Sequence, residues 1–118
     1  MVTLVFLYEP DLFFSSRIES AGARFGLEVK TMVTLNALEV ALKGGLPKLL
    51  IVNLDVLEER GESLAGLVSP GGCRLVGYYS HVDAKSAGGA LRAGFEVVVP
   101  RRAFAVKLNE IFAELGSG

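Results

Sequence analysis

The sequence predicts a single α/β domain in which helices cover both faces of a central parallel sheet. Short apolar runs typical of buried strands alternate five times with segments of helical periodicity. The connections are short, and parallel strands need right-handed crossovers, which place helices on both faces of the sheet. The 118 residues, of which 51% are apolar, suffice for one core but not for two ordinary domains.

The first two strand–helix units have clear boundaries. Thr3–Leu7 is apolar and β-branched, which is typical of a buried strand. Asp11 can cap the helix that follows, and Gly26 is placed to end it. Leu27–Thr31 alternates like a second strand, and the leucine-rich helix after it stops at the glycine pair 44–45.

The middle of the chain carries the most apolar strand and the weakest helix. Leu49–Asn53 is a continuous apolar run with a polar end, as expected at the centre of a parallel sheet. Glu58–Val68 predicts a helix that Gly61 and Gly66 weaken, because glycine within a helix costs about 1 kcal/mol relative to alanine. Arg74–Tyr79 predicts the fourth strand.

The last part of the chain predicts two more helices and the fifth strand. Ser80 and Asp83 fit a capping box, so a helix of small residues is expected next. Val97–Val99 predicts the fifth strand, and a clear amphipathic stripe after it predicts the final helix. The domain is therefore expected to span residues 1–115, with residues 116–118 as a frayed tail.

The composition limits the kinds of partner. Basic and acidic residues nearly balance, 12 against 13, so no overall field attracts nucleic acid or an anionic membrane. The single cysteine, Cys73, permits no internal disulfide and fits a reducing compartment. The apolar start is too short for a membrane span and lacks a basic leader. We therefore expect a cytoplasmic protein that binds neither nucleic acid nor membrane.

One cluster of polar residues is placed where an α/β sheet binds its ligands. Ligand sites in such sheets lie beyond the carboxyl ends of the strands. The polar residues that follow the predicted strands form the candidate site; they are Tyr8, Glu9, Asp11, Asn53, Asp55, Ser80, His81, Asp83, Arg101 and Arg102. No glycine-rich phosphate loop follows the first strand, which disfavours a dinucleotide, and we expect no cofactor.

Several of these residues have a structural as well as a functional interpretation. His81 and Asp83 could serve acid–base chemistry or bind a metal, but a single histidine is a weak zinc signal, and a place at the cap of the fourth helix is the simpler role. Arg101 and Arg102 could bind a phosphate or an acidic partner through their fork geometry. The alternative is an ion pair across the strand ends, with Glu9, Asp11 or Asp55 as the acid.

Two segments resemble response-regulator receiver domains. Leu46–Asn53 is similar to their third strand, and Ala93–Arg101 is similar to the segment that leads into their fifth. The chain also resembles short, stand-alone, receiver-like bacterial proteins in its segments 11–14, 81–83 and 101–104. The resemblance implies the CheY-like, flavodoxin-like fold, which is a three-layer α/β/α sandwich with the strand order 2-1-3-4-5.

The departures from the receiver pattern fall on the residues that receivers use for chemistry. The phosphate-accepting aspartate would be Asn53, and the acidic metal-binding pair would be Tyr8 and Glu9. The hydroxyl residue and the lysine of the receiver pattern fall on Tyr79 or Ser80 and on Arg101. An amide is a poor nucleophile and brings no charge to Mg²⁺, so aspartyl phosphorylation is not expected.

The resemblance together with these departures implies a non-catalytic pseudo-receiver. Such a chain is a signalling module that acts through protein contacts and independently of phosphorylation, and we expect neither enzymatic activity nor a bound metal. One alternative is an atypical receiver that accepts phosphate on Asp55. Another is a sensor of small anions at the strand edge, with the candidate ligands Asp11, Asp55, His81, Asp83 and Arg102.

The fourth predicted helix contributes to the expected contact surface. Gly88 and Gly89 would let another chain approach closely, and Arg92 shares a face with Arg101 and Arg102 that also includes the fifth strand and the last helix. Arginines on this face can form charge-assisted bonds to the carboxylates of a partner. We expect that partner to be another protein, of unknown identity, or a second copy of the chain in a two-fold dimer.

Overall fold

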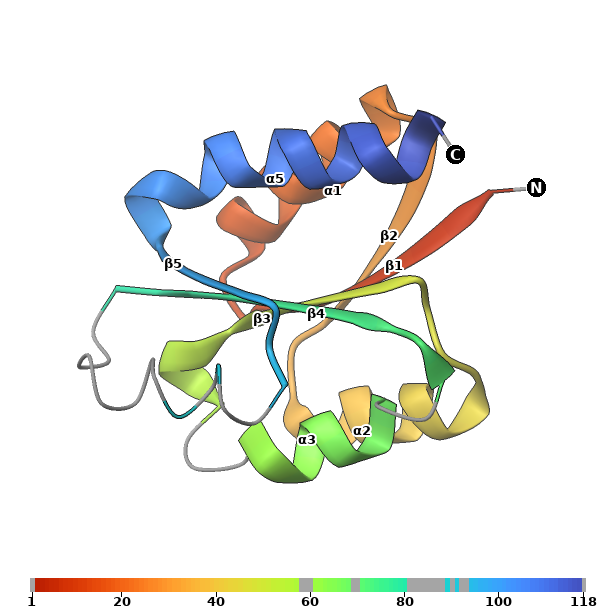
Figure 1. The fold of residues 1–118 in the computed structure, drawn as a ribbon, viewed down its shortest axis with the longest axis vertical. Coiled ribbons are helices and arrows are strands. Elements are labelled where there is room, and N and C mark those ends of the chain that lie inside the picture. Colours follow the sequence, from red (N-terminus) through yellow and green to blue (C-terminus); the bar gives the residue numbers. More distant parts are fainter. Residues whose placement is uncertain are drawn as a thin grey trace.

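The computed structural model describes residues 2–57, 61–68, 71–80, 89, 91 and 94–117, which build a parallel sheet between two layers of helices (Figure 1). The five strands follow the order β2-β1-β3-β4-β5. They are β1 (Thr3–Tyr8), β2 (Leu27–Met32), β3 (Leu49–Asn53), β4 (Arg74–Tyr79) and β5 (Val97–Pro100), and all four strand pairs are parallel. The predicted fold class and strand order are confirmed.

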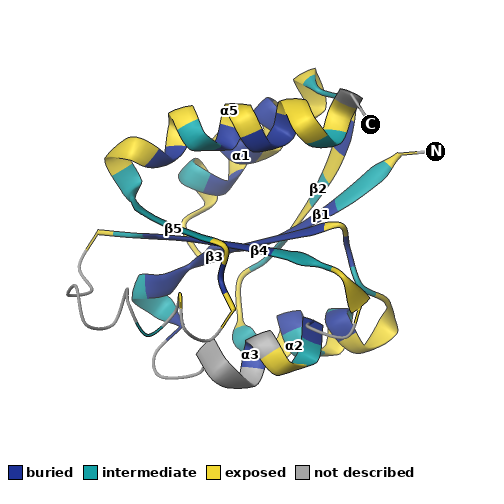
Figure 2. Ribbon diagram, in the orientation of Figure 1, coloured by how far each residue is buried: buried dark blue, intermediate teal, exposed yellow. Residues whose placement is uncertain are grey.

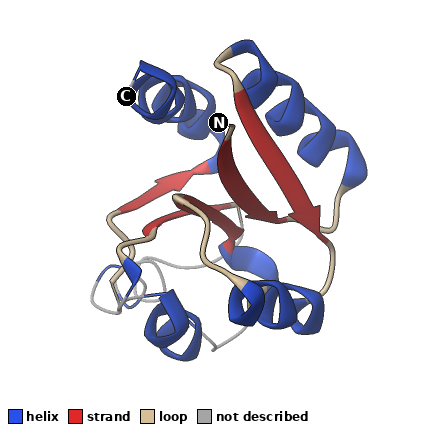
Figure 3. Cartoon of the chain, turned by 90° about the vertical axis from the view of Figure 1, so that its right-hand side faces the viewer, coloured by secondary structure: helices blue, strands red, loops and turns tan. Residues whose placement is uncertain are grey.

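Helices cover both faces of this sheet. α1 and α5 lie on one face, and α2 and α3 lie on the other (Figure 1; Figure 3). Their bounds are Leu12–Arg24 for α1, Leu35–Gly44 for α2, Gly61–Val68 for α3 and Arg101–Ser117 for α5, and a short 3-10 turn, η1 (Leu54–Val56), follows β3. Each strand end on the carboxyl side therefore faces loops and helix starts, where side chains from distant parts of the chain can meet.

The alternation of side chains along each strand divides the core into two clusters. Val5 and Leu7 of β1 pack with residues of α1 and α5, whereas Phe6 and Tyr8 pack with residues of α2 and α3. Every residue of β3 is buried, and Figure 2 shows the central strands as mostly buried. The same period of two residues decides which polar side chains at the strand ends can meet.

The start of α1 is fixed by the predicted cap. The Asp11 carboxylate accepts hydrogen bonds from the backbone N–H groups of Phe13 and Phe14, at 2.9 and 3.3 Å. These bonds satisfy two of the donors that a helix leaves unpaired at its start. Gly26, with a φ of +76°, follows the end of the helix, as expected for a residue in the left-handed region.

The last helix is longer than its apolar stripe indicates. α5 starts at Arg101, directly after β5, and continues to Ser117, so Gly116 and Ser117 are helical where the sequence predicts a frayed tail. The reason is the close packing of this helix end against the end of α1. A Cβ atom at Gly116 would lie 2.6 Å from the carbonyl oxygen of Phe25, so any residue other than glycine would clash there.

The predicted fourth helix lies mostly outside the described residues. Gly89 and Leu91 are helical. The sequence also assigns functional roles to His81, Asp83, Gly88 and Arg92, which lie outside the described residues. The start of the third predicted helix, at residues 58–60, lies outside them too, so α3 is described from Gly61 onward.

Candidate functional site at the carboxyl edge of the sheet

Three polar residues stand side by side where β1, β3 and β4 end. Tyr8 pairs with Val52 across β1 and β3, which brings the next residue, Glu9, beside Asn53. Asn53 in turn pairs with Tyr78 across β3 and β4. By alternation all three side chains point to the face of the sheet that α1 and α5 cover. We call Glu9, Asn53 and Tyr78 the polar row.

Glu9 is the centre of the polar row. Its side chain is 1% exposed, and both of its carboxylate oxygens accept hydrogen bonds from the Asn53 amide, at 3.0 and 3.1 Å. The Tyr78 hydroxyl donates to one of these oxygens, and the backbone N–H of Asp11 donates to the other at 3.0 Å. A buried carboxylate is tolerated only when its oxygens have such donors. The protein itself therefore satisfies this carboxylate.

Tyr78 is held by its ring as well as by its hydroxyl. The ring stacks on Phe104 of α5, with 4.5 Å between centroids, and meets the ring of Phe14 of α1 edge-on at 5.3 Å. Burial raises the pKa of the Tyr78 hydroxyl far above its ordinary value, and the hydrogen bond to Glu9 raises it further. The hydroxyl therefore keeps its proton and remains a donor across the physiological pH range.

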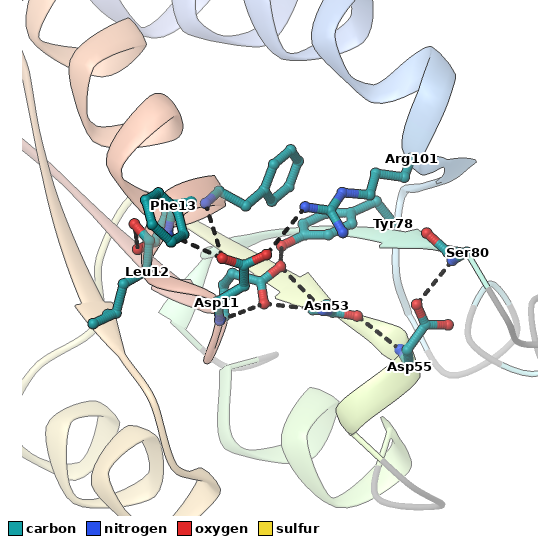
Figure 4. A network of polar contacts seen from close by, with 11 residues as sticks. Asp11, Leu12, Phe13, Asn53, Asp55, Tyr78, Ser80 and Arg101 are labelled. Atoms are coloured by element: carbon teal, nitrogen blue, oxygen red, sulfur yellow. Dashed lines mark hydrogen bonds and ion pairs between the residues drawn. The ribbon is translucent and has the colours of Figure 1, made fainter.

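A second chain of hydrogen bonds leads from the polar row to the end of β4. The Asn53 side-chain oxygen accepts from the backbone N–H of Asp55 at 2.9 Å, which fixes the start of η1. The Asp55 carboxylate accepts from the backbone N–H of Ser80 at 2.9 Å. Figure 4 shows Asn53, Asp55 and Ser80 linked in this order. The amide of Asn53 thus serves as a donor on one side and an acceptor on the other.

Arg101 connects the start of α5 to the start of α1, close to the polar row. Its guanidinium lies 3.6 Å from the Asp11 carboxylate and packs over the ring of Phe14, 3.7 Å from the centroid. The sequence allows Glu9, Asp11 or Asp55 as the acid that pairs with Arg101, and in the structure this acid is Asp11. Glu9 instead accepts from Asn53, and Asp55 accepts from the backbone N–H of Ser80. Arg102 is exposed.

Two residues of the predicted site do not join it through their side chains. Tyr8 lies beside Glu9 in sequence, but it points to the opposite face, where its hydroxyl donates to the carbonyl oxygen of Val56 at 3.3 Å. The interaction of Ser80 with the site runs through its backbone N–H rather than its hydroxyl. Sequence reasoning missed Tyr78, which supplies the hydroxyl instead. The signal was present, since Tyr78 shares the alternation of Val76, whose side chain faces α1 and α5.

Comparisons with known proteins identify the fold. No family model and no curated protein matches the sequence. Among solved structures, a response regulator from Thermotoga maritima matches at 13% identity and a TM-score of 0.81, and the match covers 100% of both chains. An orphan response regulator of H. pylori matches at 12% identity and 0.77, over 98% of this chain and 94% of that one. The chain has the receiver fold.

A third structure with this fold is relevant to the site. It is an atypical orphan response regulator with a phosphorylation-independent regulatory mechanism, which matches at 13% identity and a TM-score of 0.74. The match covers 95% of this chain and 96% of that chain.

No helix in the described part of this receiver-like chain is long and apolar enough to cross a membrane.

The residues at the receiver position for Mg²⁺ do not fit that ion. Mg²⁺ takes oxygen ligands and is held in proteins through carboxylates. Glu9 is the only carboxylate of the polar row, and both of its oxygens already accept hydrogen bonds from protein donors. No cluster of three metal-ligating side chains occurs among the residues that the structure describes.

Proposed function

We propose that this chain is a non-catalytic pseudo-receiver, a signalling module that acts through protein contacts and independently of phosphorylation. The observation that carries the proposal is the hydrogen bonding of Glu9. Its carboxylate receives donors from Asn53, Tyr78 and the backbone of Asp11. In a receiver this position would supply charge to a metal ion, whereas here the carboxylate serves to join three strand ends.

Asn53 supports the proposal from the side of the nucleophile. Aspartyl phosphorylation needs a carboxylate that can attack phosphorus, and an amide cannot do so. Both polar atoms of the Asn53 side chain also form hydrogen bonds within the protein, because its nitrogen donates to Glu9 and its oxygen accepts from the backbone N–H of Asp55. The orphan regulator with a phosphorylation-independent mechanism has the same fold, so a receiver fold is compatible with signalling of this kind.

The proposed contact surface of the module is the face formed by the predicted fourth helix, β5 and α5. Gly89 is helical and half-buried, and a Cβ atom there would meet no atom of the described residues within 4 Å. The first atom of a side chain at this position therefore does not clash with the described core. Leu12 and Phe13, which are exposed by 68% and 88% at the start of α1, supply a second apolar surface suited to protein contact.

Phosphorylation is tested first with acetyl phosphate and Mg²⁺, followed by intact-mass analysis. We expect no phosphoryl adduct on the native chain, while a receiver with an intact aspartate forms one in the same mixture. Asn53→Asp alone is not expected to restore the adduct, because the metal ligands remain incomplete. A labile adduct that disappears in Asp55→Asn would refute the proposal and establish the alternative phosphoacceptor.

A second experiment tests the response to a phosphoryl mimic. Beryllofluoride with Mg²⁺ is added to ¹⁵N-labelled protein, and the amide spectrum is recorded before and after. The spectrum of the pseudo-receiver should not change. Shifts that spread from the strand ends to β5 and α5 would mean that the site is competent, even if no stable adduct forms.

Self-association is tested by light scattering over a concentration series. If the chain forms the expected two-fold dimer, Gly89→Arg combined with Arg92→Glu should abolish it while leaving the melting temperature nearly unchanged. Gly66→Arg combined with Lys43→Glu provides a control of similar charge at exposed sites of α3 and α2, on the other face of the sheet. A dimer that survives the first pair would place the contact elsewhere, and the Leu12 and Phe13 surface would be tested next.

A further inference from the structure

A cleft lies between α1 and α5, on the outer side of the layer that covers the polar row. Its volume is about 240 Å³. The apolar part of its lining consists of Phe14, Ile18, Ala21, Phe104, Ala105 and Leu108. A cleft of this size is below the range of about 300–1,000 Å³ that drug-sized ligands occupy, so it fits a smaller molecule.

Three arginines line the same cleft. Arg17 and Arg24 come from α1 and are exposed, and Arg101 comes from the first turn of α5. Arg24 lies seven positions after Arg17, which is about two helical turns or roughly 10 Å along the same side of the helix. None of the described residues that line the cleft is acidic. The cleft therefore combines an apolar floor with an excess of positive charge.

The arginines differ in how far they are already paired. In the described part of the chain, neither Arg17 nor Arg24 forms an ion pair. Arg101 contacts Asp11 through one nitrogen, at 3.6 Å, and its guanidinium is fixed by packing over Phe14. An arginine held in this way loses little freedom when it binds a further oxyanion, and its fork geometry matches carboxylate and phosphate.

We propose that the α1–α5 cleft binds a small amphipathic oxyanion. Its carboxylate or phosphate group contacts the arginines, and its apolar body, of the size of one aromatic ring with a short chain, lies on Ile18, Phe104 and Leu108. This site shares Arg101 with the anion site expected at the strand edge, but Arg102 does not line the cleft. It also does not depend on whether the polar row can be phosphorylated.

The chemistry of the ligand is tested by titration of ¹⁵N-labelled protein in amide spectra. 4-Phenylbutyrate and phenyl phosphate are the amphipathic probes, and they distinguish a carboxylate from a phosphate head group. 4-Phenylbutanol lacks the charge, and acetate and inorganic phosphate lack the apolar body. We expect saturable shifts in α1 and α5 with at least one amphipathic probe, and affinities at least about tenfold weaker for the three control compounds.

The position of the site is tested with exposed residues, so that the fold is preserved. Arg17→Gln combined with Arg24→Gln should weaken binding of the amphipathic probe by about tenfold. Ala105→Trp should abolish it by filling the cleft, and Ala105 is exposed, so the core is left intact. Arg102→Gln is the control, since it removes an exposed arginine of α5 that lies outside the cleft.

The outcomes that overturn the proposal are equally specific. No saturable shift in α1 and α5 with either amphipathic probe means that the cleft binds no such ligand. Equal weakening by Arg102→Gln and by the Arg17 and Arg24 pair places the anion at the strand edge instead. If Ala105→Trp binds the amphipathic probe as strongly as the native chain does, the probe does not lie in the cleft. The amide spectrum of each free variant shows whether it is folded, so a loss of binding cannot be confused with unfolding.

Discussion

The hydroxyl of Tyr78 donates a hydrogen bond to the Glu9 carboxylate, although 69 positions separate the two residues in sequence. This bond crosses β3, because Asn53 stands between the strands that carry its two partners. It links the end of β4 to the end of β1 at the edge where a receiver performs its chemistry. Its contribution to folding can be measured directly.

Tyr78→Phe should destabilise the fold by about 1.5–3 kcal/mol, the usual contribution of a hydrogen bond to a charged group. The substitution keeps the ring that stacks on Phe104, so the loss reports on the hydroxyl alone. Urea unfolding measures the difference in free energy. Tyr79→Phe is the control, because Tyr79 is half-buried on the opposite face and packs there against the other core cluster. Equal losses in the two variants would mean that the bond to Glu9 contributes nothing specific.

Tyr78 should also make stability depend on pH above about 10, the ordinary pKa of an unfolded tyrosine. Its pKa is raised in the folded state by burial and by the bond to Glu9. Above pH 10 the unfolded chain therefore loses this proton before the folded chain does, so stability is fully present below that pH and falls as pH rises. The free energy of unfolding, followed between about pH 9 and pH 11, should fall more steeply in the native chain than in Tyr78→Phe. Parallel curves would refute the assignment.

Asn53→Asp should place a second carboxylate about 3 Å from Glu9 and remove the amide donor that both Glu9 oxygens accept. An unpaired buried charge of this kind costs about 3–5 kcal/mol at neutral pH. The two carboxylates should share a proton as pH falls, since their pKa in the folded state is raised above the unfolded value, so stability should recover toward pH 5. Urea unfolding at both pH values tests this, with the exposed Asn109→Asp as control. A variant as stable as the control at neutral pH would contradict the prediction.

Gly22→Ala and Gly66→Ala should shift stability in opposite directions. A Cβ atom at Gly22 of α1 would lie 2.6 Å from Val29 of β2 and 3.5 Å from the ring of Phe112, whereas at Gly66 of α3 it would meet no atom of the described residues within 4 Å. We expect Gly66→Ala to add about 0.5–1 kcal/mol through helix propensity and Gly22→Ala to lose about 1–3 kcal/mol through overpacking. Thermal or urea unfolding of both variants decides this. A stabilised Gly22→Ala would show that α1 can move away from β2.

The sequence predicts the frame of the molecule well, for reasons that particular elements make clear. β3 and β4 have the predicted bounds, Leu49–Asn53 and Arg74–Tyr79, because continuous apolar runs between turn residues have few other solutions. The cap at Asp11 is confirmed because a cap depends on contacts within four residues. The closing residues of α5 were not predicted, because their helical state depends on packing against Phe25, which lies far away in sequence.

The sequence predicted which residues follow the strand ends better than it predicted which way their side chains point. Glu9, Asn53 and Asp55 lie at the expected edge, whereas Tyr8 faces the other side and Tyr78 was not recognised. Which of two adjacent residues points to which face depends on where each strand begins, and a shift by one residue reverses every side chain. The sequence could not show which acid forms the ion pair with Arg101. The distance from Arg101 to each acid depends on how the helices pack and not on sequence spacing.

The hydrogen bonds between neighbouring strand ends limit which single mutations the polar row can accept. Any substitution that adds an acid at position 53 also removes the amide that stabilises Glu9, and any that removes the Tyr78 hydroxyl takes away another donor to the same carboxylate. Each single step toward a metal-binding set of side chains therefore passes through a less stable chain. A metal-binding set of side chains at this edge would therefore require coordinated changes on three strands at once. The hydrogen bonds among Glu9, Asn53 and Tyr78 thus make the tolerance of each position depend on the residues at the other two.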